Sequence, residues 1–425
     1  MFLSLVSGIH SGVIHFSFGV WLKESGIHII YLGLLNLIFL PFCLKMFWVP
    51  FLENRKKFFR HFENRKGFLV LFELLISVFT YCLYWINPAA ISIQYLMMFG
   101  LCYAALIATK EALAIAYQME TIKSNKWGSS EGKVMSAFYI GFWIGGILLF
   151  SLASFIAWKN LFLILSMLLF LFFIMTIFIP ESRSHTKSQD SIQNKSKGSL
   201  FIEPYKELIQ RNKKILLPLI LFIALYRLQD RLLMSVTNYF FIDLAFSKTE
   251  FLIGKTIGIA CMITGGVLGS FSVKKKGYKW TMKFGMFWHG LAASLFLIQS
   301  LVPKSHVLFY FTMFFEKITR GFEGSVFFTY QMIFCSKYFI MTQLSMLLAL
   351  DKITGLTLGS ISGYIVHIFG WSWFFVFSFI GMIPAILFLR RLPSDIGQAN
   401  DLANDEEIDE CAKDSHNNDA KKQEI

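Results

Sequence analysis

Charged residues are scarce in this sequence, and so are the short motifs that mark many enzymes and metal proteins. Asp, Glu, Lys and Arg together make up 16% of its 425 residues, whereas soluble domains carry about 25%. The sequence contains no phosphate-binding GxxxxGK[ST] loop, no HExxH zinc motif and no EF-hand loop. It therefore does not indicate a nucleotide-hydrolysing enzyme, a zinc hydrolase or a calcium-binding module.

Cysteine is also scarce, and its spacing indicates neither a bridge nor a metal site. There are six cysteines and no CxxC pair. Five of them lie in apolar stretches, namely Cys43, Cys82, Cys102, Cys261 and Cys335. Such a scattered distribution predicts neither a disulfide framework nor a zinc site. We expect no metal and no cofactor.

Apolar residues, in contrast, are abundant. Hydrophobic residues make up 55% of the chain and aromatic residues 17%, and the mean hydropathy is +0.57. Apolar stretches long enough to cross a bilayer recur along most of the length. The sequence therefore predicts an all-α membrane protein with twelve transmembrane helices. These are expected at residues 2–22, 29–49, 68–86, 91–119, 134–157, 160–179, 215–237, 251–273, 281–301, 306–335, 341–368 and 371–390.

A polar segment rich in Ser, Lys, Gln and Asn divides the spans into six and six. We predict an N-terminal six-helix half at 1–180, a cytoplasmic linker at 181–214, a C-terminal six-helix half at 215–391 and a polar, disordered cytoplasmic tail at 392–425. The second half of the linker, SLFIEPYKELIQRNKK, has the pattern of a short interfacial amphipathic helix. Two six-helix pseudo-repeats joined by a long loop describe the major facilitator fold.

The distribution of lysine and arginine predicts the orientation. With both termini placed in the cytoplasm, the inner loops and tail carry 28 basic residues and the outer loops carry four. Membrane proteins keep basic loops on the cytoplasmic side. The asymmetry also accounts for the net charge of +13, since basic loops face an anionic lipid leaflet. We therefore expect a lipid bilayer and no nucleic acid among the partners.

The tenth span carries charges that a membrane helix normally lacks. Glu316, Lys317, Arg320 and Glu323 lie in the middle of FYFTMFFEKITRGFEGSVFFTYQMIFC. A charge at the bilayer centre costs roughly 2.5–3.5 kcal/mol or more unless it is paired or faces a wet cavity. Glu316, Arg320 and Glu323 share one helix face by their i, i+4, i+7 spacing. We expect this face to look into a central cavity.

Three further spans place an acid close to a base. These are Arg227 and Asp230, with Arg231, in span 7, Lys110 and Glu111 in span 4, and Asp351 and Lys352 in span 11. Neighbouring opposite charges enter a membrane as a neutral pair at reduced cost. One interpretation is a set of structural salt bridges. The other is a pathway in which cations hold an anionic solute and acids carry protons. Glu73 in span 3 is equally open to a structural or functional role, and His10 and His289 fit packing residues better than proton relays.

Small residues one helical turn apart recur as GxxxG. Examples are Gly8 with Gly12, Gly141 with Gly145, and Gly265 with Gly269. Such pairs let membrane helices approach closely. They either pack helices together or form surfaces on which the two halves rock, and we favour packing.

Several segments, in the same order, resemble one family of bacterial permeases. The opening SGIHSGVIHFSFGVWLKESG is similar to a first helix that begins SGLP and later contains AWL. CLKMFWVPFLEN resembles KFLWSPLLDR, LYRLQD resembles LYKLGD, and FFEKITRGFEGSVFFTYQ resembles FFENLxxGxGTxAFVA. FCSKYFIMTQLSMLLAL and SGYIVHIFGWSWFFVFS match further family segments. The chain thus resembles the AmpG group of muropeptide permeases from residue 1 to about 390.

This resemblance implies a proton-driven importer of N-acetylglucosaminyl-anhydro-N-acetylmuramyl peptides. It marks Asp230 and Glu316 as matches to family acids and Glu53 as a substitute for a family Asp. Arg65 and Lys66 match the basic start of the family's third span. Glu53, Arg65 and Lys66 are therefore candidates for a gating loop.

Other positions depart from the family pattern. The family's fourth span reads SQDIxxDAW, whereas here Lys110 and Glu111 follow Thr109, and Ile115 replaces the second Asp. His10 stands where SGLP has proline. The pattern does not require the charges at Lys317, Arg320, Glu323, Asp351 and Lys352. The departures suggest a divergent paralogue with a changed substrate or coupling, or a poorly active copy.

We therefore predict a secondary active transporter that imports anhydro-muropeptides or related anionic saccharide-peptides with protons across the bacterial inner membrane. It is expected to act as a monomer. One alternative is a transporter for another anionic solute, of the sugar phosphate, nucleotide or acyl-CoA type; another is a non-transporting membrane sensor. A membrane-embedded enzyme fits less well, because the predicted outer loops are very short and the inner loops are basic and featureless.

Overall fold

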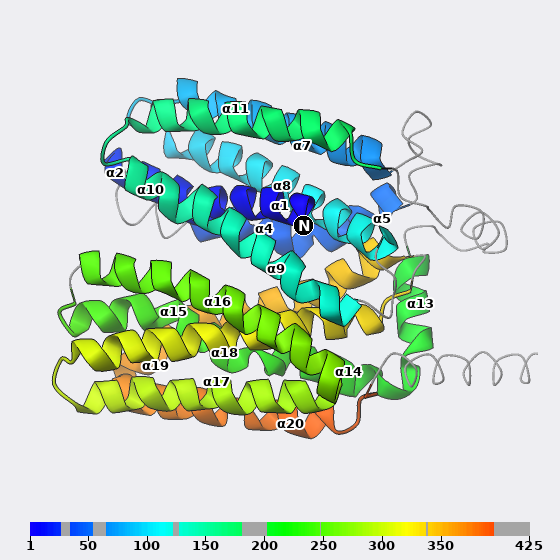
Figure 1. Cartoon of the computed structure of the whole chain (residues 1–425), viewed down its shortest axis with the longest axis vertical. Coiled ribbons are helices and arrows are strands. Elements are labelled where there is room, and N and C mark those ends of the chain that lie inside the picture. Colours follow the sequence, from blue (N-terminus) through cyan, green and yellow to red (C-terminus); the bar gives the residue numbers. More distant parts are fainter. Residues whose placement is uncertain are drawn as a thin grey trace, which may run out of the picture.

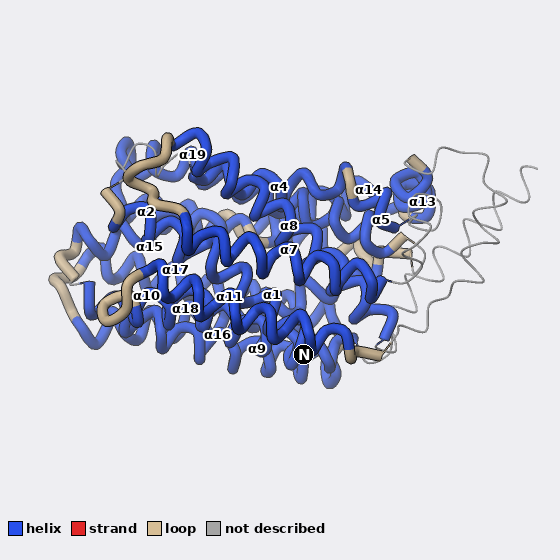
Figure 2. The backbone as a smooth tube through the Cα atoms, turned by 90° about the horizontal axis from the view of Figure 1, so that it is seen from above, coloured by secondary structure: helices blue, strands red, loops and turns tan. Residues whose placement is uncertain are grey.

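The chain folds into two bundles of helices that lie against each other. The computed structural model describes residues 1–26, 35–53, 65–121, 127–180, 202–246, 248–336 and 339–394, and these residues form helices and loops without a strand. Figure 1 shows the bundle of the N-terminal half above the bundle of the C-terminal half, with the helices of both running in roughly the same direction. Figure 2 shows that short loops join most of the helices.

The described residues of the N-terminal half form six helical segments. The first is α1 (Phe2–Gly12), η1 (Val13–Ser17) and α2 (Phe18–Glu24); the second is η2 (Leu35–Phe39), α4 (Leu40–Leu44), η3 (Lys45–Phe47) and α5 (Val49–Glu53). The third and fourth are α7 (Arg65–Trp85) and α8 (Ile93–Thr121). The fifth is α9 (Trp127–Trp143), η5 (Ile144–Leu148) and α10 (Leu149–Leu152), and the sixth is α11 (Trp158–Ile177).

The C-terminal half also contains six segments, preceded by α13 (Glu203–Arg211). They begin with η6 (Lys213–Ile215), α14 (Leu216–Tyr226) and α15 (Leu228–Asp243), followed by α16 (Lys248–Lys276), α17 (Tyr278–Leu301) and α18 (His306–Ile333). Helix α19 (Ile340–Ile380) forms the fifth segment and the start of the sixth, which α20 (Ile383–Leu389) completes. Gly370 interrupts α19 with φ 77° and ψ 173°, a conformation that favours glycine. The interruption falls between the predicted spans 11 and 12.

Length and composition agree with a membrane protein. Eight helices among the described residues are long and apolar enough to cross a membrane. The remaining segments are broken by 3₁₀ turns, as in the second span, or carry several charges, as α18 does. This arrangement confirms the predicted all-α fold with two six-helix repeats. The predicted tail beyond residue 394 and most of the predicted linker lie outside the described residues.

Glycines allow the closest helix contacts within each half. A Cβ atom at Gly141 would lie 1.9 Å from the backbone oxygen of Leu5, and one at Gly265 would lie 1.9 Å from that of Ile318. Because both contacts join helices of the same half, these GxxxG pairs hold the bundles together, as favoured from the sequence. The two halves meet elsewhere: α9 packs on α16, where a Cβ at Gly132 would lie 2.8 Å from Oγ of Ser270.

Two π-helical turns face each other in the N-terminal half. The turns η1 and η5 lie in the first and fifth segments. A π turn breaks the usual backbone hydrogen-bond pattern. The hydroxyl of Ser17 donates to the backbone oxygens of Gly145 at 2.8 Å and Gly146 at 3.1 Å. The side chain of Ser17 in η1 therefore provides a hydrogen-bond donor to two backbone carbonyl groups of η5.

Candidate functional site: a cavity and its buried charges

A cavity of about 220 Å³ lies between the two halves. Its charged lining residues are Glu111 from α8, Arg227 and Arg231 from the seventh span, and Asp351 and Lys352 from α19. Polar and apolar side chains complete the wall, among them Ser7, Gln118, Tyr139, Phe327 and Gln331. The lining thus contains three cations and two acids. Ile115, which replaces a family Asp, also faces this cavity.

A second cavity of about 310 Å³ lies further along the same helices. His15 and Gly355 line it, whereas Ser4 and Leu348 line the first cavity. Residues seven or more positions apart on a helix are roughly 10 Å apart along its axis. Arg231 and Lys352 line both cavities. These two cations therefore stand at the boundary between them.

Ion pairs hold the charges around the first cavity in place. Arg231 forms an ion pair with Asp351, and Arg227 lies 4.0 Å from the same carboxylate. On the N-terminal side of the cavity, Nζ of Lys45 on the second span lies 3.2 Å from the carboxylate of Glu111 on α8. Lys352 instead stacks over the ring of Phe42, 4.4 Å from its centroid. The sequence neighbours Asp351 and Lys352 therefore have different partners.

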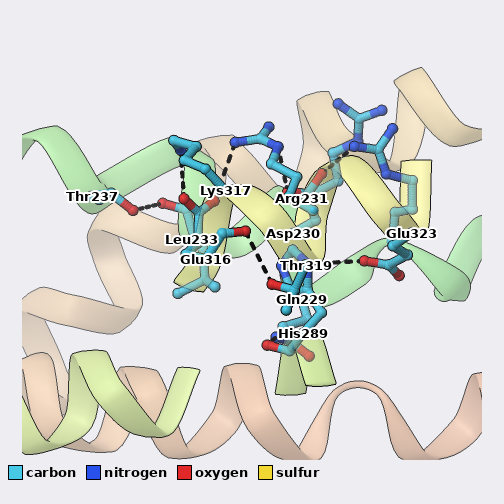
Figure 3. Close-up of polar contacts among 12 residues, drawn as sticks. Gln229, Asp230, Arg231, Leu233, Thr237, His289, Glu316, Lys317, Thr319 and Glu323 are labelled. Atoms are coloured by element: carbon cyan, nitrogen blue, oxygen red, sulfur yellow. Dashed lines mark hydrogen bonds and ion pairs between the residues drawn. The ribbon is translucent and has the colours of Figure 1, made fainter. Parts of the chain in front are cut away.

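A second group of charges lies inside the C-terminal half (Figure 3). Arg320 lies 3.0 Å from Asp230 and 3.4 Å from Glu316, and Asp230 lies 2.5 Å from Arg227. These contacts join the interior of the half to the cavity wall.

The charged face of α18 makes two further pairs in the same interior. Lys317 lies 2.6 Å from Glu316, and Glu323 lies 3.0 Å from Nδ1 of His289. The i, i+3 and i, i+4 spacing expected from the sequence is found in the pairs of Arg227 with Asp230 and of Glu316 with Arg320.

The structure does not place the charged face of α18 on the wall of the first cavity. Among the described residues that line the central cavity, α18 contributes Gly324, Phe327, Phe328 and Gln331, and not Glu316, Lys317, Arg320 or Glu323. The charged face turns toward α15 and α17 instead. Its charges find partners there, since Asp230 and His289 lie on those helices. Paired charges can be buried within a helix bundle without access to water.

The N-terminal half holds a compact cluster that the sequence neighbours do not reveal. Nε2 of His10 and Nζ of Lys110 each lie 3.2 Å from one oxygen of Glu73. Lys110 and Glu111 do not pair with each other, since Lys110 pairs with Glu73 on α7 and Glu111 pairs with Lys45 on the second span. Only the cost of placing Glu73 in an apolar span could have indicated that it has a partner.

A set of polar contacts ties the two halves together at the α13 end of the molecule. The carboxylate of Glu53 accepts hydrogen bonds from the backbone N–H groups of Met341 at 2.9 Å and Thr342 at 3.0 Å. Arg65 lies 3.7 Å from Glu53 and 2.6 Å from Glu120. We call Glu53, Arg65, Met341 and Thr342 the latch. Among the described residues, no acid pairs with Lys66.

Helix α13 lies across this end of both bundles (Figure 1). The hydroxyl of Tyr205 donates to the backbone oxygen of Met46, and the side chain of Gln343 donates to that of Pro204 at 2.9 Å. Burial and the nearby carboxylate of Glu53 raise the pKa of Tyr205 to about 12. The hydroxyl therefore stays protonated and remains a donor. Through these contacts α13 touches both halves beside the latch.

Comparison with known proteins identifies the family. The family model described as Major Facilitator Superfamily matches residues 1–348. The chain belongs to the major facilitator superfamily. This membership confirms the prediction of a membrane transporter rather than a membrane-embedded enzyme. A solved structure of this superfamily, the proton:xylose symporter XylE, matches with a TM-score of 0.65 at 14% identity, over 92% of this chain and 94% of that one.

Curated relatives place the chain within the superfamily. The "Putative transporter AmpG 2" of Rickettsia bellii is 28% identical over 398 residues, which cover 92% of this chain and 95% of the relative. The anhydromuropeptide permease of Escherichia coli K12 is 22% identical over 393 residues, covering 92% of this chain and 78% of that protein. The chain is therefore a divergent AmpG-like member of the major facilitator superfamily.

Proposed function

We propose that this transporter imports an anionic saccharide-peptide of the anhydromuropeptide class, together with protons, across the bacterial inner membrane. The observation that supports it best is the pair Arg231 and Lys352, which stands between the two cavities. A solute that passes from one cavity to the other meets both cations. Such a position favours a solute with a carboxylate or phosphate group.

The solute class rests on the relatives. One of them is named an anhydromuropeptide permease, and molecules of that class carry carboxylates. The cavity of about 220 Å³ is smaller than the roughly 300–1,000 Å³ of most ligand pockets. The two halves must therefore move apart before such a solute enters.

The latch supports a gating role for Glu53 and Arg65. Glu53 belongs to the N-terminal half and its hydrogen-bond donors belong to the C-terminal half. Separation of the halves at this end breaks both bonds and exposes the first cavity. In the proposed orientation, with both termini and α13 in the cytoplasm, this motion releases the solute into the cell. Lys66 remains a candidate for the same gating loop. We also propose that the protein acts as a monomer.

The contacts divide the charged residues into those proposed to bind the solute and those proposed to stabilise the C-terminal half. Arg227, Arg231, Glu111, Asp351 and Lys352 line the cavity. We propose that Asp230, Glu316, Lys317, Arg320 and Glu323 instead hold the C-terminal half together through their mutual ion pairs.

Transport in proteoliposomes tests the proposal. Labelled anhydromuropeptide is compared with a sugar phosphate, a nucleotide and acetyl-CoA, with and without a protonophore. We expect accumulation of the anhydromuropeptide that the protonophore abolishes. Accumulation unaffected by the protonophore rejects proton coupling, and preference for another member of the panel rejects the solute class. No movement of any member supports the sensor alternative.

A further inference from the structure

Three side chains from three spans of the N-terminal half meet at one buried point. His10 on α1 and Lys110 on α8 contact the two oxygens of Glu73 on α7, each at 3.2 Å. The side chains of His10 and Glu73 are fully buried, and that of Lys110 exposes 1% of its surface. We call these residues the triad. With a neutral imidazole it carries no net charge, since one ammonium balances one carboxylate.

One nitrogen of the His10 ring is unused. Because Nε2 faces a carboxylate, it is the nitrogen that carries the hydrogen of the neutral ring. Nδ1 then presents a free lone pair, and it has no hydrogen-bond partner in the part of the chain that the structure describes. A buried acceptor without a partner is unfavourable. Nδ1 of His10 is therefore suited to a ligand that binds reversibly, and the smallest such ligand is a proton.

Lys110 connects the triad to the central cavity. Its Nζ donates to Oγ of Ser7 at 3.1 Å, and Ser7 lines the cavity. The ammonium group thus lies between Glu73 and the space proposed for the solute. An anion in that space attracts Lys110 and weakens its hold on Glu73. A protonated His10 then supplies the positive charge that the buried carboxylate requires.

In the part of the chain that the structure describes, no further acid forms an ion pair with His10 or Lys110. The next charged group on α8 is Glu111, which faces the cavity and pairs with Lys45 on the second span at 3.2 Å. His15, further along the first span, stacks on the ring of Phe39 at 4.4 Å instead. The triad therefore responds as a unit to the charge in the cavity.

The C-terminal half provides a contrast. Its spans 7, 9 and 10 correspond to spans 1, 3 and 4 in the repeat, and they also hold a buried His–Glu pair, His289 with Glu323 at 3.0 Å. Beside that pair, however, Arg227 and Arg320 hold Asp230. Arginine remains charged at all working pH values, so it keeps its acid ionised. No arginine pairs with Glu73 in the described part of the chain.

We propose that His10 and Glu73 bind the proton that this transporter couples to solute movement, and that Lys110 is the positioning residue that links the site to the charge in the cavity. The inference deepens the proposed function and rests on it. On the loading side, a hydronium ion gives its proton to Nδ1 of His10 and becomes water. On the release side, the same N–H bond breaks and a water molecule takes the proton. No electrons are transferred.

Transport of labelled anhydromuropeptide by the full chain in proteoliposomes separates coupling from binding. Exchange of solute across the membrane needs no proton gradient, whereas accumulation does. We expect His10→Gln to exchange solute like the natural protein and to lose accumulation. The matched variant His289→Gln, in the other half, should keep both. Full accumulation by His10→Gln, or its loss only in His289→Gln, overturns the proposal.

A second measurement is independent of the solute. In ¹⁵N NMR spectra of histidine-labelled protein, the His10 signal is identified by its absence in His10→Asn. We expect its second nitrogen to gain a proton as the pH is lowered over the range in which the protein stays folded. A ring that keeps one protonated nitrogen throughout overturns the site even in an active transporter. A ring that titrates in a protein that moves no anhydromuropeptide supports the site and rejects the proposed solute.

Discussion

Arg231 and Asp351 join α15 to α19 by an ion pair at the boundary between the two cavities. Arg231 is mostly buried and Asp351 is buried almost completely. The pair is therefore both a link between two helices of the C-terminal half and a part of the solute pathway. These two roles can be separated by experiment.

Replacing Asp351 with asparagine should destabilise the protein. Removing one partner of a buried ion pair costs roughly 3–5 kcal/mol, because the other charge is left uncompensated. We expect a clear fall in the thermal unfolding temperature of the purified protein. The double variant Asp351→Asn with Arg231→Gln should unfold at a higher temperature than the single variant. A fall in the double variant equal to the sum of the falls in Asp351→Asn and Arg231→Gln alone would show that the two side chains are not coupled.

Lys352 and Lys317 offer a test of which charges meet the solute. Lys352 lines both cavities, whereas Lys317 pairs with Glu316 inside the C-terminal half. We expect Lys352→Gln to raise the KM for an anionic solute by about tenfold or more. Lys317→Gln should lower the unfolding temperature and leave the KM unchanged. A raised KM in Lys317→Gln with an unchanged KM in Lys352→Gln would instead show that the charged face of α18 contacts the solute.

The latch can be weakened without changing its shape by replacing Glu53 with glutamine. The carboxylate accepts two backbone hydrogen bonds across the halves, and hydrogen bonds to a charged group contribute about 1.5–3 kcal/mol. We expect the α13 end to open more often. Cys335, which is buried near Glu53, should then react faster with a maleimide, by about tenfold. Site-resolved mass spectrometry measures the change, and an unchanged rate at Cys335 argues against the latch.

The close contacts made by glycine predict a difference between two substitutions. At Gly265 an added methyl group would overlap the backbone of Ile318, whereas at Gly363 it would meet nothing within 4 Å. Overpacking a well-packed contact costs roughly 1–3 kcal/mol. Gly265→Ala should therefore lower the unfolding temperature, while Gly363→Ala should leave it unchanged or raise it slightly. Similar effects of both would contradict the packing.

The sequence predicts the helical segments well, because length and hydropathy are properties of each segment alone. The predicted turn between the last two spans falls at Gly370, and the predicted amphipathic segment contains α13. Pairs within one helix turn, such as Arg227 with Asp230, also follow from spacing.

The partners between segments could not be predicted in the same way. Lys110 and Glu111 are adjacent in the sequence and point to different sides of α8, so each finds its partner on another span. The direction of the charged face of α18 depends on Asp230 and His289, which lie about 90 and about 30 residues earlier in the chain, respectively. Such contacts depend on how the segments are rotated against one another, and hydropathy does not determine that rotation.

The paired π turns η1 and η5 carry a consequence for the length of the chain. A π turn contains one residue more than the α turn that it replaces. Loss of one residue within Ile144–Leu148 can therefore convert η5 into an ordinary turn and leave both flanking stretches facing as before. The same deletion elsewhere in the fifth segment would rotate one part of it by about 100°. At these two places, the first and fifth segments can shorten by a residue and keep their faces.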